Sequence, residues 1–142
     1  MIRLTLPFPP SLNHMYPSGR NGRRFLSKAG VRYVQLVSDC VHIARFDLAR
    51  GVHGHCPKPG FGISAQSMPL TCRLGLKLVL NVPDKRKRDI SNCVKAVEDS
   101  LTKAGVWLDD SQIDRLIVER GVQTKGGDCW AAVWDLGTEC GP

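Results

Sequence analysis

Residues 71–105, "TCRLGLKLVLNVPDKRKRDISNCVKAVEDSLTKAG", decide the fold, because the hydrophobic period changes within this one stretch. Up to Asn81, apolar residues occupy every second position from Cys72 to Leu80, against Arg73, Lys77 and Asn81, which predicts a strand. After Asp89, apolar residues recur every three or four positions, which predicts a helix. Gly105 then ends the helix, as glycines commonly do just past a helix C-terminus. A strand, a basic loop and a helix therefore follow one another directly.

The predicted helix has two different faces when its residues are spaced at about 100°. Apolar side chains fall on one side and polar side chains on the other, so the helix buries one side and presents the other. The apolar side consists of Ile90, Cys93, Val94, Val97, Leu101 and Ala104. The polar side consists of Asn92, Lys95, Asp99 and Lys103.

The remaining elements extend this unit on both sides. Residues 2–6 alternate as a half-buried strand, and the prolines that follow stop it. Ser27 is a candidate cap for a helix whose buried face carries Val31, Val34, Val37, Val41, Ala44 and Leu48. Near the end, "RLIVERGV" and "DCWAAVWDL" flank "QTKGG", which predicts a C-terminal hairpin. The order β-α-β-α-β-β predicts an α/β domain in which two main helices pack on a mixed sheet of about four strands.

The length of 142 residues predicts a single domain, residues 1–142, with a Gly- and Pro-rich surface insertion at about 51–69. The six cysteines include no C-x-x-C pair, so we interpret them as reduced core thiols. The first residues lack the pattern of a signal peptide, and no apolar run reaches the ~18 residues of a membrane span. We therefore expect a cytoplasmic protein without a membrane partner.

The formal net charge of +7 indicates a polyanionic partner, because lysines and arginines that neutralise phosphates supply most non-specific nucleic-acid affinity. The cations concentrate at Lys85, Arg86, Lys87 and Arg88, directly before Asp89. Carboxylates of Asp84, Asp89, Asp99, Asp109 and Asp110 could hold Mg²⁺ or Mn²⁺ against a phosphate if the chain after Trp107 folds back along the helix. The same residues could equally be a solvated basic run, a helix cap and turn acids.

Three segments together resemble one known family. They are "PDKRKRDISNCVKAVEDSLTKAGVWLDDSQI" from residue 83, "LTLPFPPSLNHMY" from residue 4, and "TKGG" at residues 124–127. Their pattern, a basic run into R-D-x-x-N, a helix with K-A and then A-G-x-W-x-D-D, resembles the RusA family of Holliday-junction resolvases. The resemblance covers most of the chain, with residues 51–69 matching poorly.

The resemblance implies a homodimeric endonuclease that binds four-way DNA junctions and nicks two opposing strands with Mg²⁺ or Mn²⁺, without an organic cofactor. It implies that Asp89, Lys95 and Asp110 are catalytic, and that Asp89 and Asp110 bind the metal. We expect Ser91 and Asp109 as further candidates for metal binding. The expected DNA contacts are Lys85, Arg86, Lys87, Arg88, Asn13, Tyr16 and Lys125.

One position departs from the family pattern, because residue 91 is a serine where the family has a third essential aspartate. Ser91 could bind the metal itself, or Asp109, Asp84 or Asp99 could supply the missing carboxylate. The protein could also bind junctions without cutting them. A third alternative is a basic regulatory or structural nucleic-acid binder whose acids only cap helices.

Overall fold

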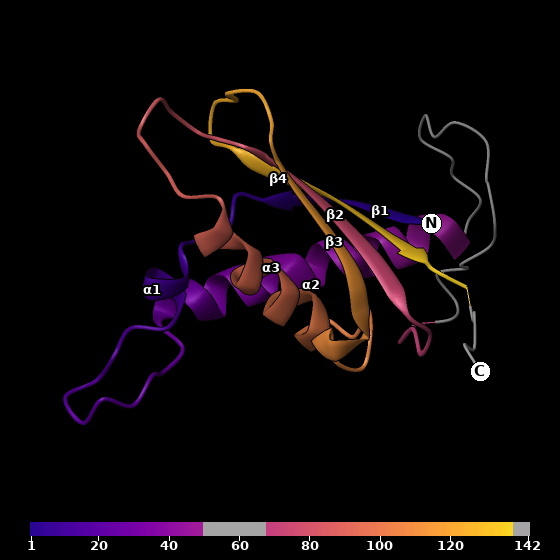
Figure 1. Cartoon of the computed structure of the whole chain (residues 1–142), viewed down its shortest axis with the longest axis horizontal. Coiled ribbons are helices and arrows are strands. Elements are labelled where there is room, and N and C mark those ends of the chain that lie inside the picture. Colours follow the sequence, from indigo (N-terminus) through magenta and orange to yellow (C-terminus); the bar gives the residue numbers. More distant parts are fainter. Residues whose placement is uncertain (50–67, 138–142) are drawn as a thin grey trace.

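The computed structural model describes residues 1–49 and 68–137 (Figure 1). The predicted order β-α-β-α-β-β is confirmed, with one short helix and one 3₁₀ turn added. The elements are β1 (Ile2–Pro7), α1 (Leu12–Met15), α2 (Lys28–Ala49), β2 (Leu74–Asn81), α3 (Ser91–Lys103), η2 (Asp110–Gln112), β3 (Ile113–Arg120) and β4 (Asp128–Asp135).

The four strands form one mixed sheet in the order β1-β4-β2-β3, which confirms the predicted sheet type. β4 pairs antiparallel with both β1 and β2, whereas β3 pairs parallel with β2. The predicted C-terminal hairpin is therefore wrong, because β2 lies between β3 and β4. β2 buries almost its whole length, so the central position suits its near-continuous apolar sequence. The Gly-containing segment 121–127 passes the end of β2 instead of closing a tight turn (Figure 1).

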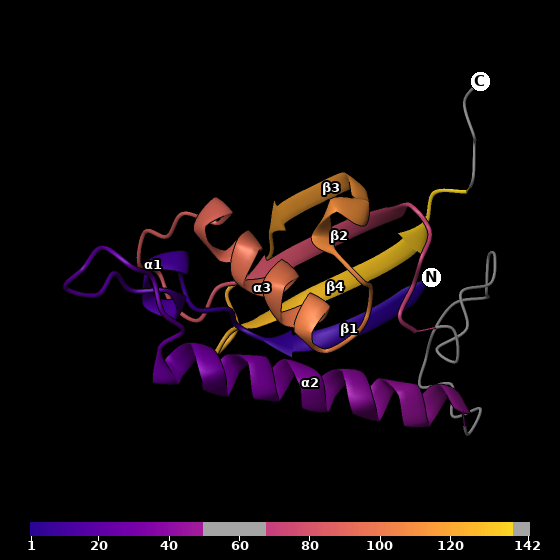
Figure 2. The same ribbon diagram turned by 90° about the horizontal axis from the view of Figure 1, so that it is seen from below.

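The helices α2 and α3 pack against each other and form one layer against the sheet (Figure 2). Ser27 caps α2 as predicted, since its Oγ accepts a hydrogen bond from the Gly30 N–H at 3.0 Å. Tyr33, Val37 and Val41 are buried, but Val31 is exposed, against the prediction. The first turn of α2 faces α1 through Gly30, where an added Cβ would lie 3.0 Å from the Met15 carbonyl oxygen, so Val31 points outward.

The apolar side of α3 is buried as the sequence predicts, and the opposite side is open to solvent. Cys93, Val97 and Leu101 are buried and join the leucines of β2 in the core. Trp107 is also fully buried, and its Nε1–H donates to Thr102 Oγ1 at 2.6 Å. This bond helps fix the turn by which the chain leaves α3 and reverses direction.

The insertion predicted at 51–69 lies outside the described residues up to residue 67. Its end packs inward, because Met68 is partly buried against the core. In the described ranges, four cysteines are free, of which Cys93 and Cys129 are buried, as expected for core thiols. No helix within residues 1–49 or 68–137 is long and apolar enough to cross a membrane.

Candidate functional site

Three loops from distant parts of the sequence meet at one end of the sheet. Pro7 of β1 and Asn81 of β2 are both registered with Asp128 of β4, so the chain segments beyond these strands leave the sheet together. The Thr124 N–H donates to the Val82 carbonyl oxygen at 3.0 Å, which holds the third loop to the second. One pocket at this end is lined by Phe8, Pro9, Pro10, Ser11, His14, Lys87, Arg88, Asp89, Asn92 and Cys93. The three sequence segments that carry the family resemblance are thus neighbours in space.

The basic loop is shaped by Asp84, which lies one residue before it. The Asp84 carboxylate accepts two hydrogen bonds from the Arg88 guanidinium, at 2.5 and 2.9 Å, and one from the Arg86 N–H at 2.9 Å. Arg88 also lies over the Phe8 ring, 5.9 Å from its centroid. Arg88 is therefore half-buried and tied to the fold, unlike the exposed Lys85 and Lys87.

The hydrogen bonds between Asp84 and Arg88 predict how the Asp84 carboxyl group affects the stability of the fold as the pH falls. The Arg88 hydrogen bonds, followed by the Arg86 N–H, hold the pKa of Asp84 well below its ordinary value of 3.8. A carboxyl group whose pKa is depressed on folding stabilises the native state fully above the unfolded pKa and progressively less below it. We expect Asp84→Asn to lower the urea midpoint at pH 7, and the difference from wild type to shrink below about pH 4. A difference that is equal at pH 7 and pH 3 would contradict this account.

Asp89 lies one residue before the N-cap of α3, and its carboxylate is surrounded by donors. Its Oδ1 accepts from the Ser91 N–H at 3.0 Å and from the Ser91 hydroxyl at 2.7 Å, and its Oδ2 accepts from Asn92 Nδ2 at 3.2 Å. The Ser91 hydroxyl, then its N–H, lower the pKa of Asp89, so the carboxylate is ionised. The structure thus brings Ser91 to Asp89, and Asp89 fixes the start of the helix as well.

The chain after Trp107 folds back along α3, which is the arrangement that the sequence argument required. As a result, Asp110 at the start of η2 forms an ion pair with Lys95 in the middle of α3. Lys95 also pairs with Asp99, at 3.1 Å. The hydrogen bond to Asp110 is the main cause that raises the pKa of Lys95, so the side chain carries its proton. Lys95 lies about one helical turn after Ser91, the first residue of α3, and Asp89 precedes that residue.

The other acidic candidates have partners of their own. Asp109 accepts the Ser111 N–H at 2.9 Å and forms a capping box with Gln112, so it fixes the start of η2. Asp84 holds Arg88, and Asp99 holds Lys95. Among the described residues, the Ser91 hydroxyl therefore bonds to Asp89, and none of these three carboxylates shares a hydrogen bond with it.

The residues predicted to contact DNA differ in their exposure to solvent and in their hydrogen-bond partners. Asn13 and Lys125 are exposed, as are Lys85, Arg86 and Lys87. Tyr16 is half-buried, and its hydroxyl accepts a hydrogen bond from Lys103 at 3.3 Å. Burial, followed by a hydrogen bond to Asp99, raises the pKa of Tyr16 to about 12. Tyr16 thus joins the N-terminal loop to the polar side of α3, while the exposed residues are available to a ligand.

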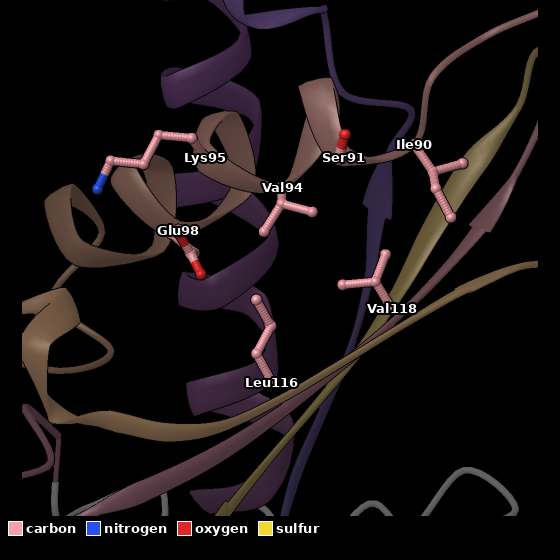
Figure 3. A pocket seen from close by; sticks show the side chains of 7 residues that line it. All are labelled: Ile90, Ser91, Val94, Lys95, Glu98, Leu116 and Val118. Carbon is pink, nitrogen blue, oxygen red and sulfur yellow. The ribbon is translucent and has the colours of Figure 1, made fainter.

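A second pocket, of about 480 Å³, lies between α3 and β3, the strand at the open edge of the sheet. Its lining is mostly apolar, with Ser91, Lys95 and Glu98 along α3, as Figure 3 shows. Glu98 is half-buried, and desolvation raises the pKa of its carboxyl group. The sequence argument did not single out Glu98, although it lies two helical turns from Ser91, on the same side of α3.

The carboxylates of Asp89 and Asp110 offer oxygen atoms, the type of ligand that a hard divalent ion such as Mg²⁺ prefers. Mg²⁺ prefers oxygen ligands, keeps several waters and often needs only one or two carboxylates beside the substrate phosphates. Asp89, Asp110 and the Ser91 hydroxyl supply such oxygens. In the two described ranges, no three His, Cys, Asp or Glu side chains converge on one point. The structure thus places Asp89 beside Ser91 and Asp110 beside Lys95, and each pair offers oxygen atoms to which a hydrated ion could bind.

Arg120, the last residue of β3, is a further charged residue at this end that the sequence argument missed. Its Nη2 donates to the Arg88 carbonyl oxygen at 2.6 Å, next to Asp89. In the predicted hairpin, β3 would pair with β4, and no pairing with β2 would place Arg120 beside the basic loop. Because β2 and β3 are parallel, their C-terminal ends lie at the same end of the sheet.

Comparison with known proteins gives a consistent result over almost the whole chain. The model of the family described as "Endodeoxyribonuclease RusA" matches residues 63–129. A crossover junction endodeoxyribonuclease RusA of Shigella sonnei (strain Ss046) is 34% identical over 136 residues, which are 96% of each chain. Proteins of the same name from Escherichia coli (strain K12) and Enterobacteria phage 82 match with the same identity and coverage. The similarity therefore includes all three loops that meet at the site.

Proposed function

Since this chain belongs to the RusA family, we propose that it is a metal-dependent endonuclease that resolves four-way DNA junctions by paired nicks in DNA recombination and repair. The observation that carries the proposal is that the basic loop and Asp89 lie directly before α3, the helix that also carries the Lys95–Asp110 ion pair. Cations there can bring a phosphate backbone to the acids. In this proposal, the four cations of residues 85–88 bind DNA phosphates and the neighbouring aspartate binds the metal.

In the proposed mechanism, Asp89 and Asp110 would hold Mg²⁺ or Mn²⁺, and Ser91 or Asp109 would be a further ligand. The bound ion supplies an activated water and stabilises charge on the phosphate. Lys85, Arg86 and Lys87 bind the flanking DNA backbone, and Asn13 and Lys125 extend that surface. Lys95 keeps its proton and neutralises charge that develops on the phosphate or on the leaving 3′ oxygen. The products are nicks with 5′-phosphate and 3′-hydroxyl ends.

The proposed active form is a homodimer that acts in the cytoplasm. A four-way junction has two equivalent strands to cut, and one chain offers one such site. Two sites related by a two-fold axis arise most simply from a C₂ dimer. A monomer would leave junctions cut on one side only.

The test of this function is the cutting of a synthetic four-way junction beside a linear duplex with the same arms. Each substrate is incubated with Mg²⁺, Mn²⁺ or EDTA. We expect paired nicks in the junction with either metal, none with EDTA, and little cutting of the duplex. Equal cutting of both substrates would reject junction selectivity, and equal binding to both would favour the basic regulatory binder.

Ser91 favours a second candidate function, a junction-binding protein that does not cut. The Ser91 hydroxyl donates to Asp89, where an aspartate would bring another negative charge. A neutral hydroxyl is a weaker ligand for Mg²⁺ than a carboxylate.

Replacing this serine should strengthen metal binding. We expect Ser91→Asp to lower the Mg²⁺ concentration needed for half-maximal cutting by roughly 10-fold, because a carboxylate replaces a neutral ligand. The measurement is a Mg²⁺ titration of junction cutting, with Thr71→Asp as a control at an exposed residue before β2. Cutting by Ser91→Asp alone would support the non-catalytic candidate for the natural chain. An unchanged Mg²⁺ requirement would show that residue 91 takes no part in metal binding.

A further inference from the structure

Arg120 lies where the sheet topology brings two strand ends together. β2 and β3 run parallel, and Leu80 is paired with Arg120, so the C-terminal ends of both strands lie at the same end of the sheet. The chain leaves β2 there to form the basic loop. The Gly121 N–H donates to the Leu80 carbonyl oxygen at 2.9 Å, which fixes the backbone next to Arg120. Arg120 is therefore held at the entrance of the loop by two strands of the sheet.

The guanidinium of Arg120 contacts the backbone beside the key carboxylate. Nη2 donates to the Arg88 carbonyl oxygen at 2.6 Å, and this carbonyl belongs to the peptide bond that joins Arg88 to Asp89. The positive charge of Arg120 also contributes to lowering the pKa of Asp89, after the hydrogen bonds from Ser91. Arg120 thus contacts the backbone directly before Asp89, although the two residues are far apart in the sequence.

Most of the hydrogen-bonding capacity of Arg120 is left over. A guanidinium has five N–H donors, and this contact uses one. Among the described residues, no carboxylate pairs with Arg120, whereas Asp84 holds Arg88 and Asp114 holds Arg73. Arg120 is exposed as well. Its anchored fork is therefore open to a ligand that reaches Asp89 from solvent.

We infer that Arg120 is a catalytic residue that binds the scissile phosphate beside Asp89. This inference rests on the proposed endonuclease function and deepens it by naming the group that contacts the phosphate. A guanidinium matches the geometry of phosphate oxygens and stays charged at any relevant pH. During hydrolysis, the water oxygen bonds to phosphorus, the bond from phosphorus to the 3′ oxygen breaks, and the proton lost by water is balanced by one gained at the 3′ oxygen. Arg120 exchanges no proton and stabilises the negative charge on the non-bridging oxygens.

The test compares Arg120→Gln, Arg120→Lys and a matched control, Arg115→Gln. Arg115 is an exposed arginine on the same strand, away from the Arg88 carbonyl. Cutting is measured in single turnover with enzyme in excess, and junction binding is measured in EDTA over a range of salt concentrations. Thermal unfolding checks that each variant folds.

We expect Arg120→Gln to slow cutting by on the order of 100-fold at saturating enzyme, as for the loss of one preorganised donor to a charged transition state. Its salt dependence of binding should fall by about one phosphate contact. Arg120→Lys should recover part of the rate, because an ammonium keeps the charge but lacks the guanidinium fork. Arg115→Gln should cut within about 2-fold of wild type, like other surface changes away from a site.

Two results would overturn the inference. The first is an Arg120→Gln variant that cuts at the wild-type rate when saturated, or that loses no more than Arg115→Gln. The second is an unchanged salt dependence of junction binding, which needs no cutting and therefore decides even if the wild-type protein is inactive. Wild-type binding without cutting would instead count against the proposed endonuclease.

Discussion

Asp89→Asn is expected to reduce junction cutting by on the order of 100-fold or more, while junction binding is retained or becomes tighter. Asparagine keeps the size of the side chain and one oxygen that can accept the Ser91 N–H, so the start of α3 should persist. What disappears is a negative charge that would hold the metal. The same charge repels DNA phosphates, which is why binding should not suffer.

The measurement is single-turnover cutting together with a gel-shift titration in EDTA. Asp114→Asn is the control, since Asp114 is an exposed aspartate of β3 that pairs with Arg73, the residue before β2. That variant should cut like wild type. Cutting by Asp89→Asn at the wild-type rate would mean that Asp89 serves only to fix the start of α3.

The largest effect on stability is expected from Trp107→Ala, at about 3–5 kcal/mol of unfolding free energy. Trp107 is 1% exposed in the core, and its ring anchors the turn that returns the chain along α3. Loss of the ring leaves a cavity and also frees the segment that carries Asp110. Urea unfolding measures the free energy of unfolding. The rate of junction cutting at low temperature, where the variant is folded, reports whether the segment with Asp110 still supports activity.

Trp107→Phe separates packing from hydrogen bonding. Phenylalanine fills most of the volume but cannot donate to Thr102, so its cost should include about 1 kcal/mol for the lost hydrogen bond. A Trp107→Ala protein as stable as wild type would show that the turn is held by other contacts.

Local features of the fold could be predicted from the sequence, because they depend on neighbours along the chain. The sides of α3 follow from helical spacing, and Ser27 follows from the chemistry of helix caps. The order of the strands does not follow in this way. Segment 121–127 looks like a hairpin turn, yet it passes the end of β2, since pairing between strands depends on the burial of the whole sheet.

The same distinction explains which parts of the site could be found. Asp89, Lys95 and Asp110 stand in a recognisable motif, and the ion pair between Lys95 and Asp110 shows that the chain after Trp107 folds back along α3, a contact that spacing alone does not give. Arg120 carries no local signal, because its importance comes from the parallel pairing of β2 with β3. The partners of Asp84 could not be read from spacing alone, since Arg88 could equally have pointed to solvent.

The pairing of β1 with β4 has a consequence for how the chain is made in the cell. β1 leaves the ribosome early, but β4, with which it pairs from Ile2↔Val133 to Pro7↔Asp128, is synthesised near the end of the described chain. At about 5–20 residues per second, the hydrogen-bonding edge of β1 waits for several seconds without its partner strand. Nascent chains that stop before residue 128 should therefore expose strand edges and associate with one another or with chaperones. Release from such association should coincide with the synthesis of β4.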